Sequence, residues 1–296
     1  MKITAHCFAK KVRIETLPIL FKYNNYDVAL KSDTSGDIDG LVLEITKAID
    51  PAEVDFSNET KDPQSAHLGN RLRPYKEALT EIAHLIEGYL AIHYNFPPPR
   101  FNPEKTIVNI HPETAEEKAL ISSGKVSGGF GDIFHDEKCP SYRWSEKILP
   151  TLDVGINNLT GFSFISQAMR SQANNDQEVA FFLYFRIVEG YCSDGSTQLE
   201  QALIKNKEAL KKYLIYDETI KDTLKKILSD LNLPSKSNID FDGLISDIVL
   251  IRHKLTHFSK PNESRHHSVS INFELGILNN YMRRASLLIL SDEVGI

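Results

Sequence analysis

The first half of the chain places β-branched and aromatic residues in short runs without helical spacing. Such runs predict strands, and a cluster of turn-forming residues at 33–40 separates two of them. One segment, residues 71–94, instead repeats its apolar positions with the period of a helix, and the three prolines at 97–99 end it. Residues 50–70 and 122–131 are expected to be loops. Strands are expected at residues 2–15, 19–30, 41–45 and 106–110.

The second half of the chain changes to helical periodicity. Residues 176–191 are apolar on nearly every side, so we expect this segment to be the central buried helix. Further helices are expected at residues 198–214, 217–231, 242–258 and 275–290.

The change in character falls between about Cys139 and Pro150, where we place a domain boundary. The predicted domains are residues 1–148, which are strand-rich, and residues 149–296, which are helical. The expected fold class is therefore α+β, with a mixed N-terminal domain followed by an all-α helical bundle.

The helix expected at residues 242–258 carries an arginine where an apolar residue belongs. At 100° per residue, Arg252 falls inside the apolar arc of the helix, and His253 and His257 fall just beyond its edge. Asp240 or Asp242 is expected to cap its N-terminus. A guanidinium is always charged and carries five donors, so burial requires a partner. Two explanations remain open: an ion pair with a carboxylate in the core, or an interface at which the arginine meets a ligand.

Composition limits the class of protein. No run approaches the roughly 18 consecutive apolar residues of a membrane span, and the N-terminus lacks the apolar stretch of a secretory signal. The three cysteines are far apart, which favours a reducing cytoplasm over a disulfide framework or a zinc cluster. The net charge of −6 argues against nonspecific coating of nucleic acid but permits a local basic cleft. We expect a cytoplasmic protein with no membrane association, no cofactor and no metal.

Arg252 and His257 form an Arg-x4-His pair, with His253 directly after the arginine. An arginine followed by a histidine after four to six residues is expected about once by chance in a chain of this composition, so the context of the pair carries the weight. The pair lies on an amphipathic helix, and a nearly all-apolar helix about 60 residues earlier carries Arg186 and Glu189. His253 and His257 also have the spacing of a zinc-binding helix, but Lys254 replaces the glutamate that such a motif needs as a base.

This arrangement resembles HEPN domains, in particular their Apea-like branch. The resemblance covers roughly residues 155–292, and its most recognisable pieces are FFLYFRIVEGY at residues 181–191 and IVLIRHKLTHF at residues 248–258. His253 occupies the polar position after the arginine, where the family commonly has asparagine. The resemblance implies a metal-independent endoribonuclease that acts as a homodimer on RNA, with the two motif helices facing each other across a cleft. It also implies a bacterial defence or toxin role.

The chemistry of such an enzyme suits these residue types. A histidine titrates near neutral pH and can serve as acid or base, and an arginine fork matches the non-bridging oxygens of a phosphate. By the resemblance, Arg252 would stabilise the phosphate and His257 would transfer protons, as the two catalytic residues. His253, Lys254 and Glu189 are the expected substrate-binding residues.

Less specific explanations stay open for the same residues. Arg252 and Glu189 could form a purely structural pair, and Glu189 could instead pair with Arg186 one turn away. The domain could bind RNA or nucleotide without catalysis, or it could serve only as a dimerising interaction module. The lysines of residues 205–226 could form part of a basic cleft or merely a solvated helix face.

Overall fold

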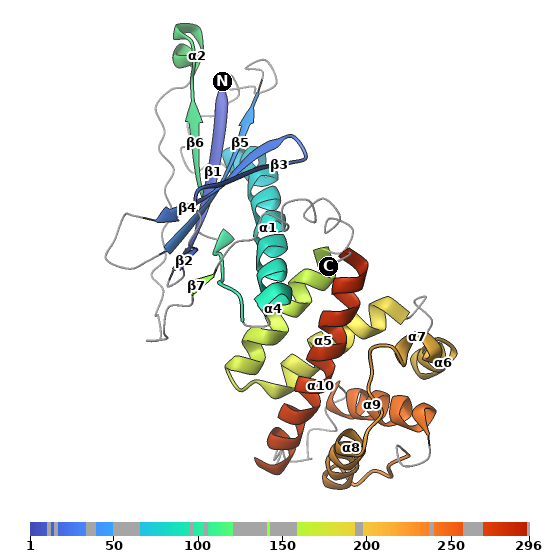
Figure 1. The fold of residues 1–296 in the computed structure, drawn as a ribbon. Helices are drawn as coiled ribbons and strands as arrows, with labels where there is room; N and C mark the ends of the chain where they lie inside the picture. Colours follow the sequence, from blue (N-terminus) through green and yellow to red (C-terminus); the bar gives the residue numbers. More distant parts are fainter. Residues whose placement is uncertain are drawn as a thin grey trace. The chain divides into compact units, whose positions relative to one another are not determined.

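A computed structural model describes residues 1–10, 13–14, 17–33, 40–49, 66–94, 97–103, 106–120, 141–142, 159–192, 198–236, 240–256 and 269–294. The chain divides into two compact units. The first combines Met1–Glu87 with Pro99–Ile156, and the second combines Gly88–Pro98 with Asn157–Ile296. The first unit contains an antiparallel sheet and the second is helical, so the fold class is α+β (Figure 1).

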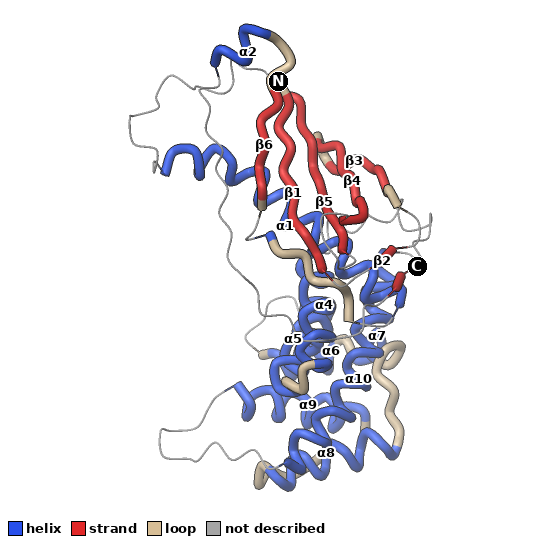
Figure 2. Tube along the Cα trace, turned by 90° about the vertical axis from the view of Figure 1, so that its left-hand side faces the viewer, coloured by secondary structure: helices blue, strands red, loops and turns tan. Residues whose placement is uncertain are grey.

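The sheet of the first unit has five strands in the order β3-β4-β5-β1-β6 (Figure 2). Its strands are β1 (Lys2–Lys10), β3 (Ile19–Tyr23), β4 (Tyr26–Asp33), β5 (Gly40–Ala48) and β6 (Ile107–His111). A second, two-stranded parallel sheet pairs β2 (Arg13–Ile14) with β7 (Ser141–Tyr142). The strand β1 lies between β5 and β6, with Ala5 opposite Ile45 and Val108.

Burial alternates along the central strands because successive side chains point to opposite faces of a sheet. In β1, Ile3, Ala5 and Cys7 are buried, whereas the residues between them are at least partly exposed. The helix α1 (Ala66–Tyr94) contacts the sheet from one side, since the Tyr23 hydroxyl donates to Glu81 Oε2 at 3.3 Å. The core of this unit therefore lies between the sheet and α1.

Two expectations about this unit were wrong in detail. Residues 19–30 form a hairpin rather than one strand, because Asn24 and Asn25 make a two-residue turn in which Asn24 has φ of 52°. Asparagine tolerates this left-handed conformation better than most residues. Helix α1 also begins at Ala66, inside the stretch expected to be a loop.

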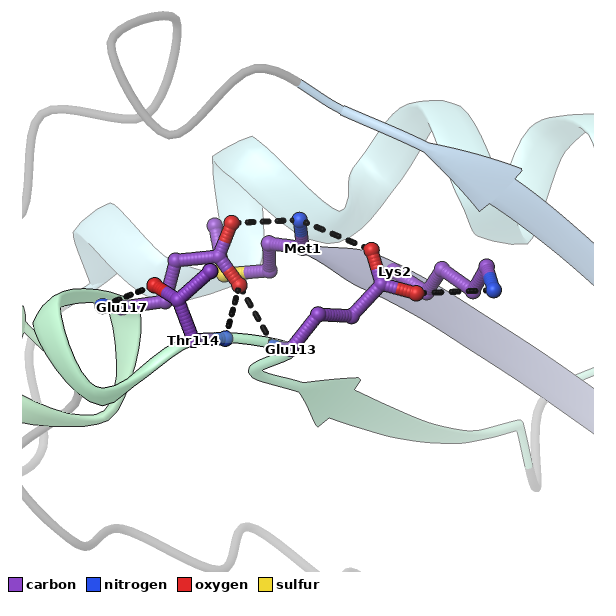
Figure 3. A network of polar contacts seen from close by, with 5 residues as sticks. All are labelled: Met1, Lys2, Glu113, Thr114 and Glu117. Atoms are coloured by element: carbon purple, nitrogen blue, oxygen red, sulfur yellow. Dashed lines mark hydrogen bonds and ion pairs between the residues drawn. The ribbon is translucent and has the colours of Figure 1, made fainter.

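A polar network joins the start of β1 to the helix α2 (Ala115–Leu120) (Figure 3). Thr114 caps α2, because its hydroxyl accepts from the Glu117 amide at 3.1 Å while Glu117 Oε2 accepts from the Thr114 amide at 3.2 Å. The other oxygen of Glu117 accepts from the Met1 amine at 2.7 Å, and Lys2 pairs with Glu113 at 2.7 Å. This reciprocal cap satisfies backbone donors at the end of a helix that has only about two turns.

The second unit is a bundle of helices (Figure 1). Its helices are α4 (Leu159–Ala173), α5 (Gln177–Cys192), α6 (Leu199–Lys205), α7 (Lys207–Leu210), α8 (Glu218–Asp230), α9 (Phe241–Thr256) and α10 (Val269–Val294). The helix expected at residues 198–214 is interrupted at Asn206, whose side chain donates to the Cys192 carbonyl at 2.6 Å. None of the helices in the described part of the chain is both long and apolar enough to cross a membrane.

Helix α5 packs against α4 and α10 but is not buried on every side. The Tyr184 hydroxyl donates to Gln172 of α4 at 2.8 Å, and its carbonyl accepts from Ser286 of α10 at 3.1 Å. On the opposite side of α5, Val179 is 42% exposed and Arg186 is also exposed. The helix expected to be central and buried is therefore buried over part of its surface, and its exposed side borders the candidate site.

Candidate functional site

Helix α9 begins at a side-chain cap. Oδ1 of Asp240 accepts a hydrogen bond from the Gly243 amide at 2.8 Å, which confirms one of the two expected capping residues. Further along the helix, the carboxylate of Asp247 is fully buried and accepts from the Lys236 amide at 2.8 Å and from the Ser235 hydroxyl at 2.6 Å. These contacts fix the N-terminal half of α9 to the segment that precedes it.

The apolar face expected for this helix is confirmed. All six aliphatic residues of the predicted arc are at most 3% exposed; they are Leu244, Ile245, Ile248, Val249, Ile251 and Leu255. Arg252 lies within this face, and 20% of its side chain is exposed. The arginine is therefore neither sealed in a core nor fully in solvent. His253 and Lys254 follow it on the exposed side of the helix.

Among the residues that the structure describes, three groups lie near the Arg252 guanidinium. Its Nη2 lies 4.0 Å from Oε1 of Glu189, its Nη1 lies 3.5 Å from Nδ1 of His253, and its central carbon lies 6.0 Å from the ring centroid of Phe185. Phe185 and Glu189 are four residues apart on α5 and so share one face of that helix. The structure thus brings together three of the predicted site residues: Arg252, His253 and Glu189.

Glu189 contacts two arginines rather than one. Nη1 of Arg186 lies 3.0 Å from Oε2 of Glu189, while Arg252 approaches the other carboxylate oxygen. Both pairings considered from the sequence therefore exist together. The Glu189 side chain is 19% exposed and that of Arg186 is 56% exposed, so the carboxylate lies at the protein surface between two cations.

A small gap lies among apolar side chains of the helical unit, and Phe185 both lines it and contacts Arg252. The space open to the centre of a water molecule is about 10 Å³, about enough for one water and far too little for a nucleotide. A nucleotide therefore does not fit inside this gap. The gap is lined by Phe185, Val188, Leu203, Leu210, Leu214, Ile245, Ile248 and Met282.

His257, the second predicted catalytic residue, lies outside the described residues, as do His266 and His267. Helix α9 is described to Thr256, so His257 follows directly in the sequence. Among the described residues, no three histidine, cysteine, aspartate or glutamate side chains come together as a metal site would require.

The lysines of helices α6 to α8 are largely paired with acidic residues. The ammonium of Lys207 lies 3.0 Å from the carboxylate of Asp242, and that of Lys226 lies 3.1 Å from the carboxylate of Glu274. The remaining pairs are Lys211–Glu208, Lys212–Asp292 and Lys221–Glu218. Pairing lowers the net positive charge of this surface, so the lysine-rich sequence mainly forms solvated helix faces. Among the described residues, the positive charge near the candidate site comes from Arg186, Arg252 and Lys254.

Sequence reasoning missed Phe185 as part of the site. Its ring lies under the guanidinium at a distance typical of cation–π contact, and the only signal in the sequence is its position four residues before Glu189.

Comparison with protein-family models, with curated proteins and with solved structures finds no match to this chain. The resemblance to HEPN domains and the roles it implies therefore stay predictions.

Proposed function

We propose that the chain is a metal-independent endoribonuclease that cleaves RNA at a site built around Arg252 and His257. The observation that carries this proposal is the position of Arg252. Its charged guanidinium is partly exposed on α9 and lies near Glu189, His253 and the ring of Phe185. A guanidinium in such a setting is positioned before substrate arrives, which is what electrostatic stabilisation of a phosphate requires.

The reaction follows from the residue types. A base removes the proton of a ribose 2′-hydroxyl, and the 2′-oxygen then forms a bond to the neighbouring phosphorus. The bond from phosphorus to the 5′-oxygen breaks, an acid protonates that oxygen, and the products are a 2′,3′-cyclic phosphate and a free 5′-hydroxyl. His257 performs the proton transfers, and Arg252 stabilises the charge on the phosphorane.

A homodimer completes this scheme, because one chain contributes only one Arg-x4-His set. Two sets facing each other across a cleft supply both an acid and a base. His253 and Lys254, exposed beside Arg252, contact the RNA and orient it. By the family resemblance, the biological role is that of a toxin or an antiphage effector, with the first unit acting as a sensor or regulator.

A second candidate function is binding of RNA or nucleotide without cleavage. The partial exposure of Arg252 favours this alternative, since binding a phosphate needs an accessible arginine but no proton transfer. The two functions differ in whether His257 matters for turnover.

The test uses the full chain, a fluorescently labelled single-stranded RNA and EDTA in the buffer. Wild type is compared with Arg252→Ala and His257→Ala. Arg73→Gln serves as a matched control, because Arg73 is an exposed helical arginine paired with Glu77 at 2.7 Å in the other unit. We expect cleavage by wild type and the control, and losses of about 100-fold or more in both site variants.

The outcomes separate the candidates. Equal cleavage by all four proteins indicates a contaminating nuclease, and the enzymatic proposal is then wrong. If wild type does not cleave, RNA binding that is lost only in Arg252→Ala favours the binding module. If the protein dimerises but neither binds nor cleaves RNA, the result favours an interaction protein.

A further inference from the structure

Glu189 is the point at which two helices present arginines to the same surface. Arg186 reaches Oε2 of the carboxylate from one turn away on α5, and Arg252 faces Oε1 from α9. Two guanidiniums that share one carboxylate must lie close to each other. The group as a whole carries a net charge of +1, because two cations outweigh a single anion.

The two contacts with Glu189 differ in kind. The distance of 3.0 Å from Arg186 is that of a charge-assisted hydrogen bond, whereas 4.0 Å from Arg252 is an ion-pair distance without a hydrogen bond between these groups. More than half of the Arg186 side chain is exposed, so its remaining donors face solvent. Glu189 therefore orients Arg186 while leaving much of its surface accessible to an anion.

From this geometry we propose that Arg186 is a second phosphate-binding residue, which contacts the RNA backbone beside the phosphate held by Arg252. Glu189 acts as a positioning residue that orients Arg186 through a hydrogen bond and lies at ion-pair distance from Arg252. This inference rests on the proposed function, because it assigns the same site a substrate of at least two consecutive phosphodiesters. A planar guanidinium suits this task, since it binds phosphate oxygens through two parallel donors.

The simpler alternative is that Arg186 and Glu189 form an ordinary surface pair. The chain supplies its own reference for such a pair: Arg73 and Glu77 lie on one exposed face of α1, 2.7 Å apart, with side chains 71% and 56% exposed. Within the part of the chain that the structure describes, no arginine of another helix pairs with Glu77. If Arg186 acts only as Arg73 does, Arg186→Gln and Arg73→Gln will change the affinity for RNA by the same amount.

The experiment measures RNA binding by fluorescence anisotropy in a His257→Ala background, which prevents turnover. Affinity for a labelled single-stranded RNA is measured from about 50 to about 300 mM KCl for the background protein and for the added Arg186→Gln or Arg73→Gln. We expect Arg186→Gln to weaken binding about tenfold at the lowest salt concentration. The slope of log K against log salt should also become shallower by about 0.7, because the variant neutralises one phosphate fewer on a single strand.

A kinetic readout separates phosphate binding from a general structural effect. In the otherwise wild-type protein, Arg186→Gln should raise KM for RNA severalfold and leave kcat within about twofold. This split is expected because a flanking phosphate is bound equally in the ground state and the transition state. Damage to the packing of α5 would lower kcat as well.

Failure of this inference is distinguishable from failure of the proposed function. If Arg252→Ala abolishes cleavage but Arg186→Gln matches Arg73→Gln in affinity and salt slope, the inference is overturned and the enzyme stands. If wild type does not cleave, the enzymatic proposal fails, and the salt slopes still decide whether Arg186 contacts RNA phosphate.

Discussion

Replacing Asp247 by alanine tests whether the helix that carries Arg252 is fixed at its N-terminal half. Asp247 is fully buried on α9, where its carboxylate accepts from the Lys236 amide and the Ser235 hydroxyl. Alanine removes both hydrogen bonds and leaves the two donors without this acceptor. We therefore expect a loss of stability that is large for a single substitution.

The magnitude follows from the two bonds. A hydrogen bond to a charged group contributes roughly 1.5–3 kcal/mol, so two of them give about 3 kcal/mol at the lower end of that range. The lower end applies because Ser235 is half-buried and Lys236 is exposed, so water can replace part of the hydrogen bonding. With a urea m-value of about 2 kcal/mol/M, the midpoint should fall by roughly 1.5 M.

The matched control is Asp242→Ala on the same helix. Asp242 pairs with Lys207 at 3.0 Å, but the two side chains are 34% and 39% exposed, so the expected loss is about 1 kcal/mol or less. Unfolding is followed by far-ultraviolet circular dichroism, and amide hydrogen exchange of α9 gives the local effect. Equal losses in Asp242→Ala and Asp247→Ala would refute the reasoning, as would a loss below about 0.5 kcal/mol in Asp247→Ala.

Two further predictions concern the helical unit. Gly88→Ala should destabilise it by about 1–3 kcal/mol, because the new Cβ would lie 2.3 Å from Cβ of Phe162. Gly190→Ala should instead stabilise it by up to about 1 kcal/mol, because a Cβ at Gly190 would have no atom within 4 Å. Urea midpoints that shift in the same direction in both variants would contradict this reasoning. Lys212, and next Tyr213, hold the pKa of Asp292 below its usual 3.8, so its contribution to stability is full above that value and is lost as the pH falls through the lower folded pKa. The difference in urea midpoint between wild type and Asp292→Asn should therefore shrink on acidification, and a difference independent of pH would count against the pairing.

Local sequence patterns predicted a helix best where the helix buries a single apolar face. The six aliphatic residues of α9 follow the helical period, and Asp240 caps the helix through a bond to an amide only three residues away. Such features need no knowledge of the rest of the chain. The same holds for β1 and β5, whose alternation reflects one buried face.

The misses have a tertiary or conformational cause. The turn at Asn24 lacks the glycine that usually marks a two-residue hairpin, so residues 19–30 were expected to be a single strand. The break at Asn206 depends on a hydrogen bond to the carbonyl of Cys192, which lies 14 residues earlier in the chain. Helix α5 was expected to be the central buried helix because it is apolar on nearly every side, and packing against α4 and α10 covers only part of it.

The candidate site shows why the sequence left the role of Arg252 open between an ion pair and an interface. Periodicity placed Arg252 on an apolar face but could not say which residues of α5 face it, because that depends on how two helices pack. In the structure, Glu189 pairs with Arg252 without sealing it, and a second arginine shares the carboxylate. A buried pair of one cation and one anion would be neutral, whereas here two arginines contact one carboxylate that is itself 19% exposed. The ion pair and the interface are therefore compatible, because Glu189 contacts both guanidiniums while more than half of the Arg186 side chain stays exposed.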